Sequence, residues 1–110
     1  MIPWNDFARV ELRAGTIVRA ELFPEAHKPA FRLWIDLGES LGIRASSAQI
    51  TDLYTPETLI GRQVLCVTNL APRRIGPFVS EVLVCGFYRP DGAVVLVAPD
   101  SDVDDGSRLA

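Results

Sequence analysis

The sequence predicts a mainly β protein built around one small barrel of five strands. Three observations predict it. The chain has 110 residues, of which 48% are apolar. Apolar and polar residues alternate through several short segments, and turns rich in proline and glycine separate those segments. A chain of this size and composition can bury one core without disulfides or a metal, so we expect a single domain over residues 1–110.

The first strand is expected at residues 10–22, where apolar side chains occupy nearly all of the even positions. Gly15 interrupts it, and a glycine in so long a strand usually marks the bend or bulge at which a small barrel turns a corner. The second strand, at residues 31–37, alternates in the same way, which puts Trp34 on its polar face. A short third strand is expected at residues 41–45.

One short helix is expected between the third and fourth strands. Thr55 is a typical N-cap residue, Pro56 suits the first helical position, Glu57 places an acid in the first turn, and Gly61 ends the segment. Two buried strands follow at residues 64–69 and 78–87. The loop between them, residues 70–77, is too rich in proline and glycine to continue either strand.

The two ends of the chain are expected to add short extensions. A tight turn at residues 90–92 leads into a last strand at 93–98, and the tail is expected to add an edge strand near residues 107–109. Residues 3–9 predict one helical turn with Trp4 and Phe7 on the same side. Five or six strands with a helix between the third and fourth are the order of an OB-fold barrel; a small β-sandwich is the alternative.

The apolar segments and the cysteines indicate a cytoplasmic protein. The longest apolar stretches, residues 82–85 and 93–98, are far too short to cross a bilayer, and Met-Ile-Pro begins no signal peptide. Cys66 and Cys85 lie in strand-like segments, with no second pair to make a metal knuckle. We expect two buried, reduced thiols, with a disulfide between neighbouring strands as the alternative.

The charge is unevenly distributed. Residues 1–99 hold ten Lys or Arg and ten Asp or Glu, whereas residues 100–110 hold four Asp and one Arg, for a net charge of −3. A protein that coats nucleic acid usually carries a strong basic excess, because phosphate neutralisation supplies much of its affinity. Any nucleic-acid site must therefore be local. Ten of the eleven basic residues are arginine, which suits bidentate or stacking contacts.

No catalytic activity is expected. The only histidine, His27, lies in a proline-flanked loop, and no serine or cysteine carries a nucleophile signature. No carboxylates have metal-ligand spacing, and the acids near Gly106 lack the final glutamate of an EF-hand loop. The absence of a phosphate-binding glycine loop disfavours ATP-driven work, and no cofactor is expected.

The segment at residues 69–81 carries a binding hypothesis. Arg73 and Arg74 lie in a rigid loop, flanked by the amide of Asn69 and the hydroxyl of Ser80, so several donors would converge on one anion or carbonyl-rich ligand. The alternative is that both arginines are ordinary solvated loop charges, one of them paired with Glu81.

Two motifs, in order, give the chain a family resemblance. Leu-Arg-Ala-Gly-Thr-Ile-Val at residues 12–18, followed by Phe-Pro-Glu-Ala at 23–26, resembles the opening of tRNA-binding domains, which occur alone or fused to some aminoacyl-tRNA synthetases. Residues 69–81 resemble their second signature, Asn-Leu-x-Pro, one or two basic residues, then a glycine and Ser-Glu. Residues 46–51, 72–76 and 80–84 are most similar to the CsaA branch of export-related chaperones. The resemblance covers residues 6–109.

The resemblance implies an OB-fold homodimer, joined through the N-terminal segment and the C-terminal strand, that binds unfolded or export-destined polypeptides without ATP. The residues of this chain can support such a dimer, because Trp4 and Phe7 on one helical face and the apolar Val94 and Val97 of the last strand would be costly to leave in water. The residues also allow an alternative, in which both aromatic side chains cover the open end of the barrel in the same subunit.

The positions matching the family's nucleic-acid site are Arg44, Ser46, Asn69, Arg73, Ser80 and Glu81, on the face where OB-folds bind oligonucleotides. We add Arg74, and also Trp34, which is placed to stack a base, to grip an apolar side chain or to cover the first loop. Nucleic-acid-binding relatives carry several lysines, whereas this chain has only Lys28. We therefore expect polypeptides as the principal ligands. A free-standing tRNA-binding module is the alternative.

Overall fold

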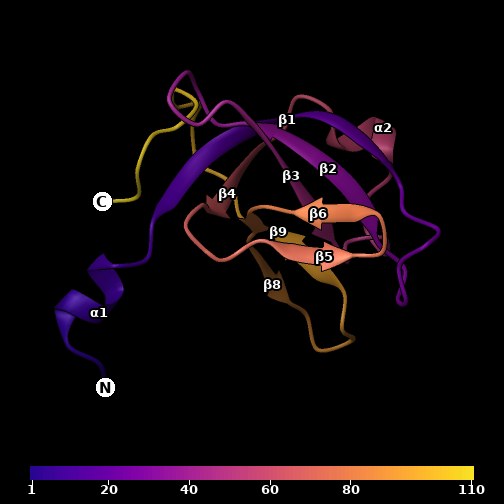
Figure 1. The fold of residues 1–110 in the computed structure, drawn as a ribbon, viewed down its shortest axis with the longest axis horizontal. Coiled ribbons are helices and arrows are strands. Elements are labelled where there is room, and N and C mark those ends of the chain that lie inside the picture. The colour runs from indigo at the N-terminus through magenta and orange to yellow at the C-terminus, as the bar shows by residue number, and fades with distance from the viewer.

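The computed structural model describes residues 1–110, and its strands form one barrel from which a short N-terminal helix projects (Figure 1). In chain order the elements are α1 (Trp4–Ala8), β1 (Leu12–Leu22), β2 (Phe31–Asp36), β3 (Ile43–Ala48), α2 (Pro56–Leu59), β4 (Gln63–Val67), β5 (Arg73–Ile75), β6 (Phe78–Ser80), β7 (Leu83–Val84), β8 (Gly86–Tyr88) and β9 (Val94–Leu96). The predicted mainly β fold, with a short helix between the third and fourth strands, is confirmed.

The main sheet has five antiparallel strands in the order β3–β2–β1–β4–β7. The long strand β1 is central: it pairs with β2 through residues 16–22 and with β4 through residues 12–16. Two hairpins, β5–β6 and β8–β9, complete the structure. The second hairpin extends the barrel wall, because Leu65 of β4 donates a backbone hydrogen bond to Val97, just beyond β9.

The core follows the alternation of the strands. Phe31, Leu33 and Ile35 are buried on one face of β2, while Arg32 and Trp34 on the other face are half-buried, as the sequence predicts. The helix α2 adds Leu59 to this core. Its predicted cap is present: the Thr55 hydroxyl accepts a hydrogen bond from the Thr58 N–H, and Pro56 holds the first helical position.

Of the two features predicted at Gly15, a bend or a bulge, the bulge is wrong. The register between β1 and β2 shifts between Ile17 and Arg19, so the bulge lies there and not at Gly15, which pairs regularly with Val64. A Cβ atom on Gly15 would lie 2.5 Å from Cγ2 of Ile35 and only slightly farther from the β2 backbone. The glycine is required because two strands approach closely, not because the chain bulges.

The strands in the second half of the chain are shorter and more numerous than predicted. The loop expected at residues 70–77 contains β5, which forms a hairpin with β6 across a turn at Gly76, where φ is +58°. The single strand expected at residues 78–87 is divided into β6, β7 and β8. The break between β6 and β7 occurs because the N–H groups of Glu81 and Val82 both donate to the Ala45 carbonyl, which turns the chain toward β3.

The acidic tail is fixed to the start of β1. The Arg13 guanidinium donates to the Gly106 carbonyl at 2.7 Å, and the Thr16 hydroxyl donates to the Asp105 carboxylate at 2.6 Å. The edge strand expected near residues 107–109 is reduced to one bridge between Arg13 and Arg108. The third strand also differs from its predicted range, since it spans Ile43–Ala48. Neither helix has the length and apolar composition needed to cross a membrane.

Candidate binding site

Ser80 and Glu81 close the barrel at the outer edge of β3. The Glu81 carboxylate accepts a hydrogen bond from the Ala45 N–H at 3.0 Å, and the Ser80 hydroxyl accepts one from the Ser47 N–H, also at 3.0 Å. An unpaired strand edge is otherwise a template for another chain. These two residues of the second signature therefore satisfy the backbone of β3 with their side chains.

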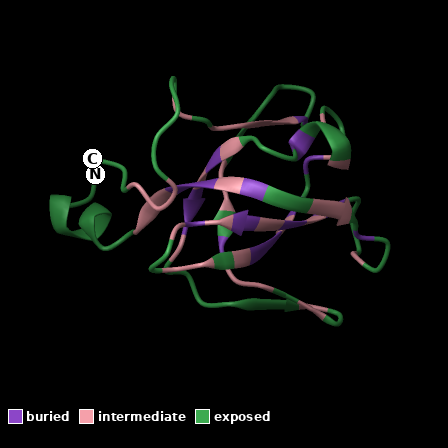
Figure 2. Ribbon diagram, turned by 90° about the horizontal axis from the view of Figure 1, so that it is seen from above, coloured by how far each residue is buried: buried purple, intermediate pink, exposed green.

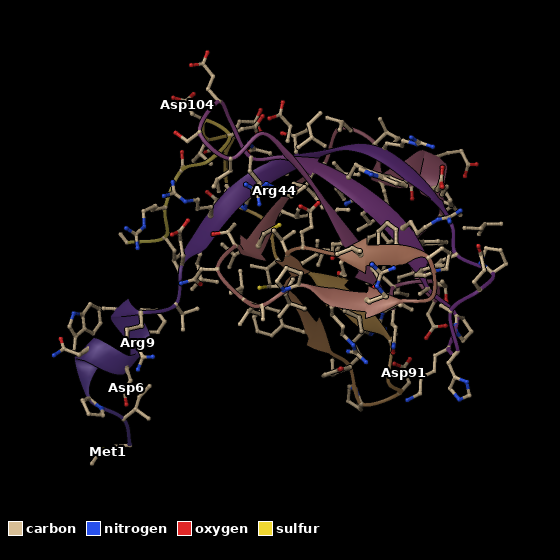
Figure 3. The ribbon with its side chains drawn as sticks, viewed as in Figure 1. Met1, Asp6, Arg9, Arg44, Asp91 and Asp104 are labelled. Carbon is tan, nitrogen blue, oxygen red and sulfur yellow. The ribbon has the colours of Figure 1, made fainter.

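Arg44 belongs to the same closure. Its Nε donates to the Leu41 carbonyl at 2.8 Å, and its Nη1 lies 4.0 Å from the Glu81 carboxylate. Figure 3 shows Arg44 at the end of the barrel away from the β8–β9 turn, where Asp91 is labelled. Arg44 is thus partly occupied by neighbours in its own chain.

An aromatic stack holds the β5–β6 hairpin against the barrel. The Phe78 ring lies edge-on between Phe23 and Trp34, with centroid distances of 5.3 and 5.9 Å. The Arg19 guanidinium lies 4.4 Å from the centre of the Trp34 ring, so the ring also contacts a cation. Trp34 therefore supports the hairpin more than it faces solvent.

Pairing within the hairpin separates the two arginines that are adjacent in sequence. Arg73 pairs with Ser80 and Ile75 with Phe78, so these side chains share the hairpin face that packs toward the barrel. Arg74 pairs with Val79 and lies on the opposite face. The expected convergence of both arginines on one ligand is not what this geometry provides.

Arg73 stands where two cavities adjoin. The larger, which we call the apolar groove, has a volume of about 460 Å³ and lies between β3, β5, β7, β8 and β9. Its apolar lining includes Ile50, Leu83, Val84 and Val94, together with the exposed ring of Tyr88. Arg73, Ser47 and Gln49 form its polar side.

The smaller cavity, which we call the basic pocket, has a volume of about 250 Å³. His27 and Lys28 of the β1–β2 loop line it opposite Arg73 and Ile75 of β5, and Ser47 and Gln49 belong to both cavities. No local pattern in the sequence indicates this grouping, because the loop and the hairpin are almost fifty residues apart. Tyr88 and Leu83 were missed for the same reason.

Asn69 and Ser46 lie outside both cavities. The Asn69 side chain accepts a hydrogen bond from the Glu11 N–H at 2.9 Å and donates one to the Arg9 carbonyl at 2.7 Å. It therefore holds the segment that joins α1 to β1. Ser46 is completely buried, and its hydroxyl donates to the Ser47 carbonyl. Ser46 is therefore inaccessible to a ligand, whereas Asn69 is exposed but already bonded to two backbone groups of its own chain.

The helix α1 projects from the barrel and has no buried residue (Figures 1 and 2). The rings of Trp4 and Phe7 lie 5.5 Å apart and are 72% and 39% exposed as residues. They do not cover the open end of the barrel in their own subunit. Figure 3 shows Met1, Asp6 and Arg9 on this arm, away from the barrel.

The two valines expected at an interface lie in different cavities. Val94 packs against the core and lines the apolar groove. Val97 lines a third cavity of about 190 Å³, which is mostly apolar and lies between β4 and the tail, beside Arg108 and Leu109. This third cavity also contacts Ala14 of β1, near the point where the α1 arm leaves the barrel.

Both cysteines are free thiols. Burial raises the pKa of Cys66 to about 12, and the neighbouring Cys85 adds a smaller increase. Cys85 is half-buried beside the apolar groove, and burial raises its pKa as well. Neither thiol is activated as a nucleophile, since only the thiolate is reactive.

Comparison with known proteins is consistent over the whole chain. Residues 12–108 match the family model described as "Putative tRNA binding domain". The structure resembles the chaperone CsaA of Bacillus anthracis str. Ames, with a TM-score of 0.94 and 46% identity over 100% of this chain and 99% of that one. CsaA of Picrophilus torridus gives a TM-score of 0.94 and 42% identity, with both chains fully covered.

A third relative is a much longer protein. The methionine–tRNA ligase of Flavobacterium psychrophilum is 37% identical over 91% of this chain. The chain spans only 14% of the length of that ligase. The similarity therefore concerns one small part of the enzyme.

Proposed function

Because the chain belongs to the tRNA-binding-domain family, and within it to the CsaA branch, we propose that it is a cytoplasmic chaperone. It holds extended segments of unfolded or export-destined polypeptides, acts without ATP and works as a homodimer. Family membership supports either a chaperone or a tRNA-binding role. The apolar groove is the observation that favours the first of these.

The groove offers a surface that suits apolar side chains. Leu83 is 49% exposed and Tyr88 is 84% exposed, although both are large and partly or wholly apolar. Exposed apolar surface of this kind commonly marks an interaction site. An extended polypeptide presents every second side chain to one side, so it can lay apolar residues along such a groove. Binding of this type is broad and weak, as a chaperone requires.

Aggregation of a chemically denatured test protein, followed by light scattering, tests the proposal. We expect suppression at a several-fold excess of the chain, unchanged by added ATP. Leu83→Glu places a charge in the groove and should abolish suppression. Leu53→Glu is a matched control, because Leu53 has a similar exposure, 44%, and lines none of the three cavities. Equal activity of both variants would contradict a role for the groove.

The proposed dimer uses the projecting arm. Trp4 and Phe7 are costly to leave in water, and the third cavity, at the same end of the barrel, provides apolar lining. Sedimentation velocity should show a dimer that the double variant Trp4→Ala/Phe7→Ala converts to monomers. Ile43→Ala, which removes an exposed apolar side chain on β3, should remain dimeric. A wild-type monomer at tens of micromolar would contradict the proposal.

A free-standing tRNA-binding module is the second candidate, supported by the family match and by the basic pocket. Binding through phosphates tightens steeply as salt falls. Titrating tRNA at two salt concentrations therefore tests it, with Arg73→Ala as the variant and Arg74→Ala, on the other hairpin face, as its control. Steep salt dependence that only Arg73→Ala reduces would favour this candidate over the chaperone.

A further inference from the structure

We propose that the basic pocket binds a carboxylate of the bound polypeptide, so that the preferred polypeptide segments carry an Asp or Glu close to an apolar stretch. The inference rests on the proposed chaperone function and specifies its substrate class. It assigns His27 and Lys28 to the site, although the sequence of their loop indicates no binding function.

The pocket is lined by basic side chains and by no acidic ones. His27, Lys28 and Arg73 line it from two separate parts of the chain, and no Asp or Glu is among the lining residues. Four arginines elsewhere on the barrel lie within 4.0 Å of a carboxylate: Arg13, Arg19, Arg32 and Arg44. Arg73 and Lys28 have no such partner. An incoming anion would supply one.

The chemistry of the lining suits a carboxylate. A guanidinium can donate two parallel hydrogen bonds to the two oxygens of a carboxylate, which an amide group cannot accept in the same way. The side chains of Ser47 and Gln49 form no hydrogen bond within the chain and remain available as further donors. The pocket therefore offers charged and neutral donors around one cavity.

The two cavities are positioned for one continuous ligand. Ser47, Gln49 and Arg73 line both, so a chain lying in the apolar groove passes beside the basic pocket. Residues i and i+2 of an extended segment lie about 7 Å apart on the same side. An acidic residue two to four positions from the apolar residues would thus reach Arg73 and Lys28.

The charge balance favours a polypeptide over RNA as the occupant. A nucleic acid carries a charge on every nucleotide and needs a broad basic surface, whereas one carboxylate needs only a local site. The chain has a net charge of −3, and its tail contributes four Asp. The groove beside the pocket is lined mainly by apolar residues.

Fluorescence anisotropy with three labelled peptides tests the inference on the full chain. The peptides share an apolar core and differ at one position, two residues after it, where they carry Glu, Gln or Lys. We expect the Glu peptide to bind roughly three- to tenfold more tightly than the Gln peptide, and the Lys peptide most weakly. Lys28→Ala and Arg73→Ala should remove the Glu-over-Gln preference, whereas Arg74→Ala should keep it. Unfolding curves check that each variant is folded. Lys28→Gln repeats the test with an uncharged side chain that is longer than alanine.

The possible results distinguish the carboxylate site from the chaperone function on which it rests. If none of the peptides binds, the chaperone proposal fails and the carboxylate site with it. If all three bind equally, the chaperone proposal stands and the carboxylate site is wrong. If an RNA oligonucleotide displaces the Glu peptide and loses more affinity than the peptide in Lys28→Ala, the pocket binds phosphate and the polypeptide assignment is overturned.

Discussion

The Glu81 carboxylate accepts a hydrogen bond from the backbone N–H of Ala45 at 3.0 Å, and the Glu81 N–H donates to the Ala45 carbonyl at 2.8 Å. The side chain and the backbone of one residue thus occupy both hydrogen-bonding groups of Ala45 at the edge of β3. A residue that the family signature places among ligand-binding positions therefore has a structural role at the barrel closure.

Replacing Glu81 by alanine should lower the free energy of unfolding by about 1–2 kcal/mol, since a charge-assisted hydrogen bond to a half-buried N–H is lost. Glu81→Gln keeps an acceptor oxygen and should lose less. Urea unfolding followed by circular dichroism measures both. Glu39→Ala is the control, because Glu39 is exposed and makes no hydrogen bond through its side chain. If Glu39→Ala and Glu81→Ala lowered the free energy of unfolding equally, Glu81 would have no role in closing the barrel.

Phe78→Ala should loosen the β5–β6 hairpin and lower the free energy of unfolding by about 1–3 kcal/mol, less than for a fully buried phenylalanine. The emission of Trp34, measured in a Trp4→Phe background, should shift because Trp34 loses its contact with the Phe78 ring. Val79→Ala, which alters the opposite face of the same strand, should change neither quantity appreciably. An unchanged Trp34 spectrum in Phe78→Ala would contradict the stack.

The cysteines should differ in their reaction with a disulfide-forming reagent at pH 8. With a pKa of about 12, Cys66 is about one part in ten thousand thiolate at that pH, and it is also buried. It should react only when the protein unfolds. Cys85 should react in the folded state, but more slowly than a free thiol, since its pKa is raised too. Rapid modification of Cys85→Ala, which retains only Cys66, would contradict this.

Glu11 should make the protein less stable in acid. Hydrogen bonds from Arg13, at 2.7 Å, and from the Thr68 hydroxyl, at 2.9 Å, lower the pKa of Glu11 below its ordinary value of 4.5. Its stabilising contribution is therefore complete above pH 4.5 and is lost as the pH falls through the lower folded-state value. Urea midpoints between pH 7 and pH 3 should fall less steeply for Glu11→Gln than for the wild type. Glu39→Gln should follow the wild-type curve.

The sequence predicted the parts of the fold that depend on local patterns. Alternation located the first two strands and the polar face that carries Trp34, and the Thr55–Pro56 pair located α2. The pattern could not show that residues 73–75 form a strand, because their proline- and glycine-rich surroundings are typical of a loop. Without that strand, Arg73 and Arg74 could not be assigned to opposite faces.

The site was less predictable because it depends on contacts between distant segments. Residues 69–81 were recognised as important, yet Asn69, Ser80 and Glu81 make hydrogen bonds to backbone groups that lie 33 to 60 residues away. Residue type indicates which groups can donate or accept, but not which partner they find in the folded chain. The basic pocket was missed for this reason, since its two halves meet only when the barrel is formed.

The hydrogen bonds of Asn69 also have a consequence for how the protein is made. Asn69 follows Arg9 by 60 residues, so a growing chain releases Trp4 and Phe7 from the ribosome long before their anchor is synthesised. During that interval the arm has no fixed direction. Its orientation is set only once β4 has joined β1, so the proposed dimer would have to form after most of each barrel has folded.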